Sequence, residues 1–385
     1  MADYIGDTIV IENGSWMIKA GFCNSDAPRT VFPPVVGVPR TPSGLKEGMK
    51  GSGAYVGDEA LAKRGILDLS YAIERGIVTD FDKMERVWHH VFQEELRVDS
   101  SEHPALLTES PLNPKANREK TTEIMFESLQ VPSLCLAVDD MLSLYASGRS
   151  SGVVLHCGAE ETRTVPIYEG HALAHAVRSS DELGGEQLTD HLLRLFSERG
   201  VSFSTEAPHE IVNHIKELLC FVALDYEREM QSFATTPSSC EQTYELPDGQ
   251  LLCVGAERFR CPEALFQPSL LGAECDSVHE MLYKTLRSCG DEELLGAEMC
   301  RNVMLAGGST LFAGMAERLQ RNLEQLGVRP EQSRVLAPPE RKYSAWIGGA
   351  LLTSLSSSLM GGNSFMISKE QYEEHGSSVV HKVCF

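Results

Sequence analysis

The sequence lacks the features that mark several common protein classes. No window approaches the roughly 18 consecutive apolar residues of a membrane span, and the opening MADYIGDTIVIENG has neither a basic region nor an apolar stretch. We therefore expect no membrane insertion and a cytoplasmic location, with the nucleus as the alternative compartment. Basic residues are also scarce, with 34 Lys and Arg against 55 Asp and Glu, which gives a net charge of −21. This charge argues against non-specific binding to nucleic acid or anionic lipid and leaves basic protein surfaces as reasonable partners.

Motifs of familiar enzymes and metal proteins are missing as well. There is no G-x-x-x-x-G-K-[ST] loop, no G-x-G-x-x-G opening a helix and no H-E-x-x-H helix. The eleven cysteines are scattered singly, without a C-x-x-C pair, so we interpret most of them as small core residues of a reducing compartment. The chain of 385 residues is long enough for two or more domains.

Alternating apolar strands and amphipathic helices predict an α/β fold. The segment VVLHCGAEETRTVPIY, residues 153–168, indicates a strand, a polar turn and a second strand, and residues 8–22 follow the same design about 140 residues earlier. This repeat predicts two related halves whose turns each hold one side of a triphosphate. In KMERVWHHVFQEEL, five residues at helical spacing are expected to face the core, namely Met84, Val87, Trp88, Val91 and Phe92.

The chain carries a series of long motifs, in this order: KAGF, DAPR, YVGDEA, ERGIVTDFD, HPALLTESPLNPKANREK, LSLYASGR, TVPIYEG, ERFRCPEALFQPS, APPERKYSAWIGG and HKVCF. Together these motifs resemble actin. The resemblance runs from end to end, with short insertions near Asp181 and Met360. It implies the actin-like ATPase fold, in which two duplicated RNase H-like α/β domains surround a cleft for Mg-ATP and each carries a smaller inserted subdomain.

The resemblance also implies domain boundaries. The first large subdomain would comprise residues 1–33, 72–146 and 344–385, and the second residues 147–183 and 274–343. A small outer subdomain would span 34–71, with a mobile loop in the Gly-, Ser- and Lys-rich segment 41–55. Its counterpart would span 184–273.

Several positions match the family's nucleotide contacts. On the adenosine side, the ribose and base contacts would be Lys216, Glu217 and Lys342, and a close backbone approach would use Gly307 and Gly308. Phe312 stands where the family usually has a tyrosine. The first phosphate loop would use Gly14, Ser15 and Lys19.

The catalytic positions depart from the family's pattern. Two aspartates and a glutamine, which organise the magnesium waters and the attacking water, are replaced by Glu12, His156 and Asp139. Trp16 replaces a glycine beside the first loop. Where the second loop of the family reads Asp-Ser-Gly-Asp-Gly-Val-Thr, this chain has His156, Cys157, Gly158, Ala159, Glu160, Glu161 and Thr162.

These changes predict weak or absent ATP hydrolysis, because phosphoryl transfer depends on positioning and electrostatics. Charges about 4 Å apart repel by roughly 4 kcal/mol at an effective dielectric near 20, so Glu160 and Glu161 facing a triphosphate would weaken binding by two or more orders of magnitude. If both side chains turn to solvent, ATP and Mg²⁺ still bind through the other contacts.

Two other chemistries remain open at this stage. A rewired, filament-forming ATPase would use His156 as a base or Asp139 to hold a magnesium water. A metal site built from His156, Cys157 and the glutamates is disfavoured, because ligands crowded into one turn cannot all converge on one ion.

The surface points to an assembly role. Leu270 and Leu271 form an apolar tip in a segment that matches the loop between the strands of the actin filament, and they would contact a partner or fold back on their own domain. The outer loop differs, with Lys46 and Lys50 in place of a more apolar tip. We therefore expect a structural, cytoskeletal subunit of a filament or larger assembly, with actin-like or cytoskeletal partners or self-association.

Overall fold

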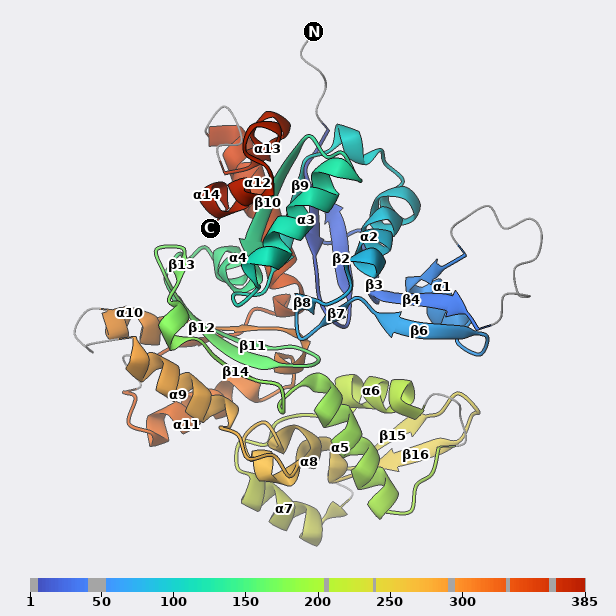
Figure 1. Ribbon diagram of the computed structural model, residues 1–385. Coiled ribbons are helices and arrows are strands. Elements are labelled where there is room, and N and C mark those ends of the chain that lie inside the picture. The colour runs from blue at the N-terminus through green and yellow to red at the C-terminus, as the bar shows by residue number, and fades with distance from the viewer. Residues whose placement is uncertain are drawn as a thin grey trace. The chain divides into compact units, whose positions relative to one another are not determined.

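The computed structural model describes residues 6–40, 53–203, 208–237, 240–289, 295–329, 333–359 and 365–384 (Figure 1). Lys46, Lys50 and most of the segment 41–55 lie outside these ranges. The chain divides into two compact units, Met1–Ser150 with Tyr343–Phe385 (unit 1) and Ser151–Lys342 (unit 2).

Unit 1 is built on a mixed sheet with the strand order β19-β10-β9-β1-β2-β3. Its strands are β1 (Ile9–Glu12), β2 (Ile18–Phe22), β3 (Thr30–Phe32), β9 (Ala105–Glu109), β10 (Ser133–Val138) and β19 (Ile367–Ser368). β1 and β2 form an antiparallel hairpin, and β1, β9 and β10 run parallel. The central strands read as continuous apolar runs, IVI and ALL, as expected for strands covered on both faces.

Helices cover this sheet. They are α2 (Phe81–His90), α3 (Lys115–Glu127), α4 (Asp139–Ala146), α12 (Ser344–Leu359), α13 (Lys369–His375) and α14 (Val380–Val383), with the short helices η3 (Ser100–Glu102) and η9 (Ser377–Val379). The predicted helix at 83–96 is confirmed as α2 followed by a π-helical segment, η2 (Val91–Leu96), and all five expected core residues are buried. α12 packs closely against α4: a β-carbon on Gly348 would lie 1.8 Å from the carbonyl oxygen of Leu142.

A smaller sheet extends from unit 1. It has the order β5-β4-β6 and consists of β4 (Val35–Pro39), β5 (Tyr55–Val56) and β6 (Leu67–Tyr71), with α1 (Gly57–Ala62) packed on it. Its separate small core contains Val35, Ala60 and Leu67. A short hairpin follows β6 in the chain; its two strands are β7 (Ile73–Glu74) and β8 (Ile77–Val78).

Unit 2 repeats the hairpin-plus-parallel-strand plan. Its sheet has the order β13-β12-β11-β17-β18, with β14 also paired to β12. The strands are β11 (Gly152–Cys157), β12 (Thr162–Tyr168), β13 (His171–Ala172), β14 (Arg178–Ser180), β17 (Val303–Ala306) and β18 (Val335–Leu336). β11 and β12 form the antiparallel hairpin, while β17 runs parallel to β11. The α/β class and the repeated strand–turn–strand design predicted from the sequence are both confirmed.

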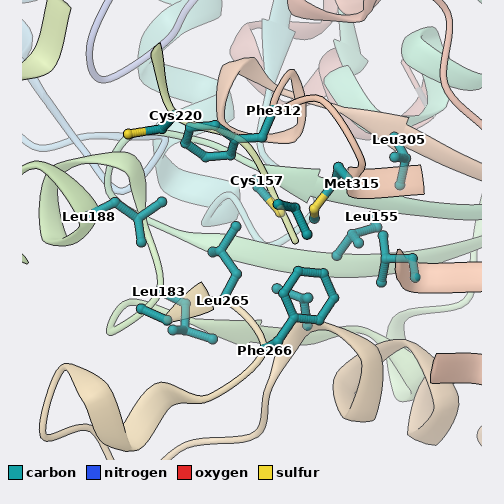
Figure 2. Packing of buried hydrophobic residues seen from close by; sticks show 14 of the residues in the cluster. Leu155, Cys157, Leu183, Leu188, Cys220, Leu265, Phe266, Leu305, Phe312 and Met315 are labelled. Carbon is teal, nitrogen blue, oxygen red and sulfur yellow. The ribbon is translucent and has the colours of Figure 1, made fainter. Parts of the chain in front are cut away.

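The core of unit 2 joins its sheet to its helices. α9 (Val278–Ser288), α10 (Leu295–Arg301) and α11 (Met315–Gln325) lie near the sheet in Figure 1. Figure 2 shows side chains of β11 and β17 packed with Leu183, Leu188, Leu265, Phe266, Phe312 and Met315 in one buried cluster. This cluster anchors β11, through Val153, Leu155 and Cys157, to the core of unit 2.

The rest of unit 2 contributes helices and a short hairpin. These elements are α5 (Gly185–Glu198), α6 (Pro208–Leu219), α7 (Tyr226–Thr235), α8 (Glu257–Glu263), β15 (Gln242–Glu245) and β16 (Leu251–Val254), with η4 (Ala174–Ala176), η6 (Pro268–Leu270), η7 (Gly308–Thr310) and η8 (Arg341–Tyr343) as short helices. A second, aromatic cluster forms around Phe259. None of the helices in the described ranges is long and apolar enough to cross a bilayer.

Candidate functional site

The turn between β1 and β2 carries the first group of predicted site residues. Glu12, buried at the end of β1, forms an ion pair with Lys19, which lies directly opposite on β2. The other carboxylate oxygen of Glu12 accepts the backbone N–H of Trp346 at 3.2 Å, and Lys19 Nζ lies 5.8 Å from the ring centre of Tyr343. Both oxygens of Glu12 therefore have partners inside unit 1, and the ammonium of Lys19 is held by a carboxylate.

The same turn, which includes Gly14, is anchored at two further points. The backbone N–H and side-chain amide of Asn13 each donate to Thr108 at the end of β9, both at 3.0 Å, and Trp88 Nε1 donates to Asn13 Oδ1 at 3.1 Å. The hydroxyl of Ser15 accepts the N–H of Gly76 at 2.8 Å. The polar groups of this turn are thus used in hydrogen bonds within unit 1. They include the hydroxyl of Ser15, which the resemblance assigns to phosphate binding, and the amide of nearby Asn13.

Asp139 and Trp16 complete the group in unit 1. Asp139 is the first residue of α4, and its Oδ1 accepts the N–H of Asp140 at 2.8 Å. A carboxylate in the first turn of a helix interacts favourably with the unsatisfied N–H groups there, so an aspartate at position 139 stabilises the start of α4. Trp16 is partly buried within the β1–β2 turn.

The second loop, residues 158–161, is fastened to the start of α5. The turn is closed by the N–H of Gly158, which donates to the carbonyl of Glu161 at 2.9 Å. Two N–H groups from α5 then bind the loop: Gly185 donates to the carbonyl of Gly158 at 3.0 Å, and Glu186 to that of Ala159 at 2.8 Å. Helix N-termini are common anion-binding elements, but these two donors already bind carbonyls of the loop.

Gly307 brings the end of β17 against this loop. It has a left-handed backbone with φ of +84°, and a β-carbon on it would lie 2.3 Å from the carbonyl oxygen of Cys157. Ser309 Oγ adds a hydrogen bond to the carbonyl of Gly158 at 3.0 Å. Gly308, by contrast, would meet nothing within 4 Å. Of the two glycines predicted to face a ligand, Gly307 is therefore required by the protein's own packing, and open space lies at Gly308.

His156, Glu161 and Arg163 form a polar network beside the loop. His156 and Arg163 are cross-strand partners on β11 and β12, so their side chains share one face, and Arg163 Nη2 lies 3.5 Å from His156 Nδ1. Arg163 is buried, with 4% of its surface exposed, and forms an ion pair with Glu161. The sequence reasoning did not single out Arg163, although the predicted hairpin register alone places it opposite His156.

Cys157 does not join this network. Alternate residues of a strand face opposite sides, so its thiol lies in the unit 2 core shown in Figure 2 while His156 faces the other way. Burial raises the pKa of the Cys157 thiol to about 12, which keeps it protonated at neutral pH. Across the described ranges, no group of three His, Cys, Asp or Glu side chains could hold a metal ion.

Glu160 is partly buried and lies close enough to Glu186 to affect its titration. Burial, followed by the negative charge of Glu160, raises the pKa of the Glu186 carboxyl. The negative charge of Glu160 therefore acts on the region where α5 begins. The negative field that it adds there opposes the binding of phosphate at the helix N-terminus.

The residues matched to the adenosine side lie on α6 and face different ways. Lys216 is buried, and its ammonium donates to the carbonyl of Gly185 at 2.7 Å and to Thr189 Oγ1 at 2.8 Å. Burial lowers the pKa of Lys216. Glu217 is exposed and accepts a hydrogen bond from Asn213 at 3.2 Å. Lys216 thus fastens α6 to the first turn of α5, whereas the carboxylate of Glu217 is accessible.

The remaining adenosine-side residues follow β17 and β18. Phe312 is buried in the unit 2 core, where Figure 2 shows it beside Cys220. Lys342 is partly buried in η8, whose position is set by its neighbour Arg341. Arg341 donates to Thr310 Oγ1 at 3.1 Å and to the Thr310 carbonyl at 2.8 Å.

The predicted apolar tip folds partly onto its own unit. Leu270 ends η6 and Leu271 follows it; both are partly buried and pack against the unit 2 core. Arg194 donates to the carbonyl of Leu270 at 3.0 Å, which holds the tip in place.

The side chains of the two loops do not fit Mg²⁺. This ion requires several oxygen ligands in near-octahedral geometry. Glu12 is bound by Lys19 and by the Trp346 N–H, and the second matching position is an imidazole with a guanidinium at 3.5 Å. His156 offers an imidazole nitrogen in place of an oxygen ligand, and the carboxylate of Glu161 is engaged by Arg163.

In each unit, an antiparallel hairpin joins parallel strands to form a mixed sheet. The chain is therefore of the class built from two similar α/β units. The family model for actin matches residues 5–385, which is nearly the whole chain. The chain belongs to the actin family.

Proposed function

We propose that this actin-family chain is a structural, cytoskeletal subunit of a filament or larger assembly and hydrolyses ATP weakly or not at all. One observation carries the proposal. The cation next to each loop is paired with a carboxylate of the same hairpin: Lys19 with Glu12 in unit 1, and Arg163 with Glu161 in unit 2. We also propose that the protein acts in the cytoplasm, where the family's cytoskeletal members work.

The pairing matters because a triphosphate needs uncompensated positive charge. Lys19, the matched phosphate-binding lysine, would have to leave Glu12 before it could bind a phosphate fully. Removing one partner of a buried ion pair costs about 3–5 kcal/mol, and each 1.4 kcal/mol is tenfold in affinity. Binding through Lys19 would therefore be weakened by about two orders of magnitude or more.

Hydrolysis would be impaired further by the groups at the catalytic positions. The position that matches the family's water-placing glutamine is Asp139, whose Oδ1 accepts the Asp140 N–H. At one magnesium-organising position stands His156, with Arg163 at 3.5 Å from its Nδ1. Neither arrangement reproduces the fixed donors and acceptors on which phosphoryl transfer depends.

An assembly role rests on the surface rather than on the loops. The tip at Leu270 and Leu271 is partly exposed and held by Arg194, so it is preorganised for a contact. Partners would be actin-like or cytoskeletal proteins, or a second copy of this chain. The net charge of −21 disfavours nucleic acid as an alternative.

The test combines binding, turnover and assembly on the full chain. Mg-ATP is titrated calorimetrically into the protein and into Glu160→Gly, and phosphate release and sedimentation are measured with and without Mg-ATP. Glu169→Gly is the matched control, because Glu169 lies in another turn of the same sheet and has a positive φ of 48°, which glycine accepts. We expect weak binding, tighter binding in Glu160→Gly alone, and sedimentation that does not depend on ATP.

A contrary result would be equally clear. Tight Mg-ATP binding by the unaltered protein, followed by assembly-dependent phosphate release, would overturn the structural proposal and establish a filament-forming ATPase with rewired residues. If His156→Ala then abolished phosphate release without weakening ATP binding, the imidazole would be identified as the base.

A further inference from the structure

Polar side chains join the C-terminal end of α9 to the strand β14 in unit 2. α9 packs against β12 and β14, and the three elements lie together in Figure 1. Arg178, on β14, donates from Nη2 to the hydroxyl of Ser288, the last residue of α9, at 3.1 Å. One turn earlier on α9, the buried hydroxyl of Thr285 forms a hydrogen bond at 2.6 Å with that of Thr164, the cross-strand partner of Arg178. The contact between Arg178 and Ser288 therefore extends a row of polar contacts between the helix and the sheet.

The guanidinium of Arg178 has an unused donor next to this contact. Its Nε is buried and has no hydrogen-bond partner among the residues that the structure describes. A buried donor without an acceptor is unfavourable, and most such groups in native proteins are paired. Nε and Nη2 form one edge of the planar guanidinium, and such an edge matches two oxygens of a carboxylate or a phosphate. The hydroxyl of Ser288 supplies one acceptor, whereas a phosphate on it would supply two.

Ser288 is accessible and has a charge pattern that kinases recognise. Its side chain is partly exposed at the end of the helix, where the hydroxyl donates to the carbonyl of Lys284 at 2.8 Å. In the sequence SCGDEE, acidic residues follow Ser288 at positions 291–293, which lie outside the described ranges. Protein kinases select substrates partly by the charges around the target residue, and acidic-directed kinases take a serine that is followed by such residues.

We propose that Ser288 is a phosphorylation site and that Arg178 binds the phosphate through Nε and Nη2. An acidic-directed kinase transfers the γ-phosphoryl group of ATP to Ser288 Oγ. The bond from Oγ to phosphorus forms, the bond from phosphorus to the β–γ bridging oxygen breaks, ADP leaves, and the hydroxyl proton passes to the base of the kinase. The product carries a charge of about −2 and three acceptor oxygens. The proposal concerns unit 2 alone and does not rest on the proposed function.

The position of Ser288 makes Arg178 decisive for the effect of the phosphate. A negative charge at the C-terminus of a helix is unfavourable, because the carbonyl groups there carry partial negative charge. Two charge-assisted hydrogen bonds from one arginine offset this cost. Phosphorylation therefore stabilises the end of α9 when Arg178 is present and destabilises it when the guanidinium is absent.

The contact also bears on the second loop, residues 158–161, through β14. β14 ends at Ser180, which pairs with Thr162, the first residue after the loop. The hydroxyl of Thr162 donates to the carbonyl of Leu183, which follows β14 in the chain. A phosphate that fastens α9 to β14 therefore also restrains the segment that borders the second loop.

Ser277, at the other end of α9, serves as the internal comparison. It also has an acidic residue three positions later, Glu280. Ser277 is only 1% exposed, however, and its hydroxyl is bound to Glu280 at 2.7 Å in the capping box of the helix. The sequence pattern therefore fits both serines, but of the two only Ser288 is accessible and contacts a guanidinium.

The experiment treats the purified full chain with casein kinase II, an acidic-directed kinase, and Mg-ATP. Phosphoserine is mapped by mass spectrometry, and hydrogen exchange is compared before and after treatment. We expect phosphate on Ser288 and none on Ser277, and about tenfold slower exchange of the N–H groups at the end of α9. In Arg178→Met the phosphate should give no protection or faster exchange. Arg178→Lys, which keeps the charge but lacks the two-donor edge, should show only part of the protection.

The contrary outcomes are specific. No phosphate on Ser288, or phosphate on Ser277 as readily as on Ser288, would overturn the assigned site. Equal protection in the unaltered protein and in Arg178→Met would overturn the role of Arg178. If Arg178→Met does not fold, full protection in Arg178→Lys would overturn the two-donor contact. Ser288→Ala is treated in parallel, because slower exchange in α9 of that variant would show that phosphate on another residue causes the effect.

Discussion

Glu12 and Lys19 occupy directly opposed positions on the hairpin β1–β2 and form an ion pair whose side chains are about nine-tenths buried. A charge on either side chain would be costly alone, because burial removes the water that stabilises it. The pair, with the Trp346 N–H on the second carboxylate oxygen, compensates both charges locally. The ion pair between Glu12 and Lys19 therefore helps to fix the first loop. A nucleotide would have to separate these two side chains in order to bind Lys19.

Glu12→Gln is expected to destabilise the protein by about 3 kcal/mol, because it leaves the ammonium of Lys19 buried without a carboxylate. The free energy of unfolding in urea measures the effect. The double variant Glu12→Leu with Lys19→Met is the control, since replacing both ions with apolar groups of similar size is close to neutral. A double variant no more stable than Glu12→Gln would show that the pair is not the cause.

Gly307→Ala and Gly308→Ala are adjacent changes with different expected outcomes. Alanine at position 307 meets a left-handed backbone and a carbonyl oxygen 2.3 Å from its β-carbon, so we expect a loss of about 2 kcal/mol or more. At position 308 the β-carbon meets nothing within 4 Å, so a change within about 0.5 kcal/mol is expected. Equal melting temperatures for the two variants would contradict the role assigned to Gly307.

Local sequence patterns were sufficient for the strands and helices that surround the site. The apolar runs and polar turns predicted both hairpins, and helical spacing predicted the buried face that includes Trp88. Long-range polar contacts were not accessible in this way. The bond from the Trp346 N–H to Glu12 joins residues 334 positions apart, and no local pattern encodes it.

The sequence also did not predict which candidate site residues turn inward and which are exposed. Lys216 and Glu217 are neighbours on α6 and look like equivalent polar residues, yet Lys216 is buried against α5 and Glu217 is exposed. Which of two adjacent helical residues turns inward depends on the helix it packs against, here α5. Arg163 could have been found, because the hairpin register pairs it with His156.

The two glutamates of the second loop are expected to differ in their effect on stability. Glu161→Gln removes the carboxylate that pairs with buried Arg163, so we expect a loss of about 2–3 kcal/mol in the free energy of unfolding. Glu160→Gln removes a charge that raises the pKa of Glu186, so it should be neutral or mildly stabilising at pH 7. Urea titrations of both variants make the comparison; a reversed order would show that Glu160, not Glu161, supports the loop.

His191 on α5 predicts a pH dependence of stability in the acidic range. Burial, followed by the charges of Arg194 and Arg260, lowers the pKa of His191 to about 4 in the folded protein. Arg194 Nη2 lies 2.9 Å from His191 Nδ1, which fits a neutral imidazole accepting a hydrogen bond. An unfolded histidine titrates near 6.5, so between about pH 6.5 and 4 the unfolded chain binds a proton that the folded protein does not.

Stability should therefore fall as the pH is lowered through this window, with His191 contributing at most about 3 kcal/mol of the loss. Carboxylates titrate in the same range, so the informative quantity is the difference between the protein and His191→Gln, measured by urea unfolding at pH 7, 5.5 and 4.5. The variant should lose less stability than the wild type on going from pH 7 to 4.5. Parallel curves would mean that the folded protein accepts the proton at His191 as readily as the unfolded chain does.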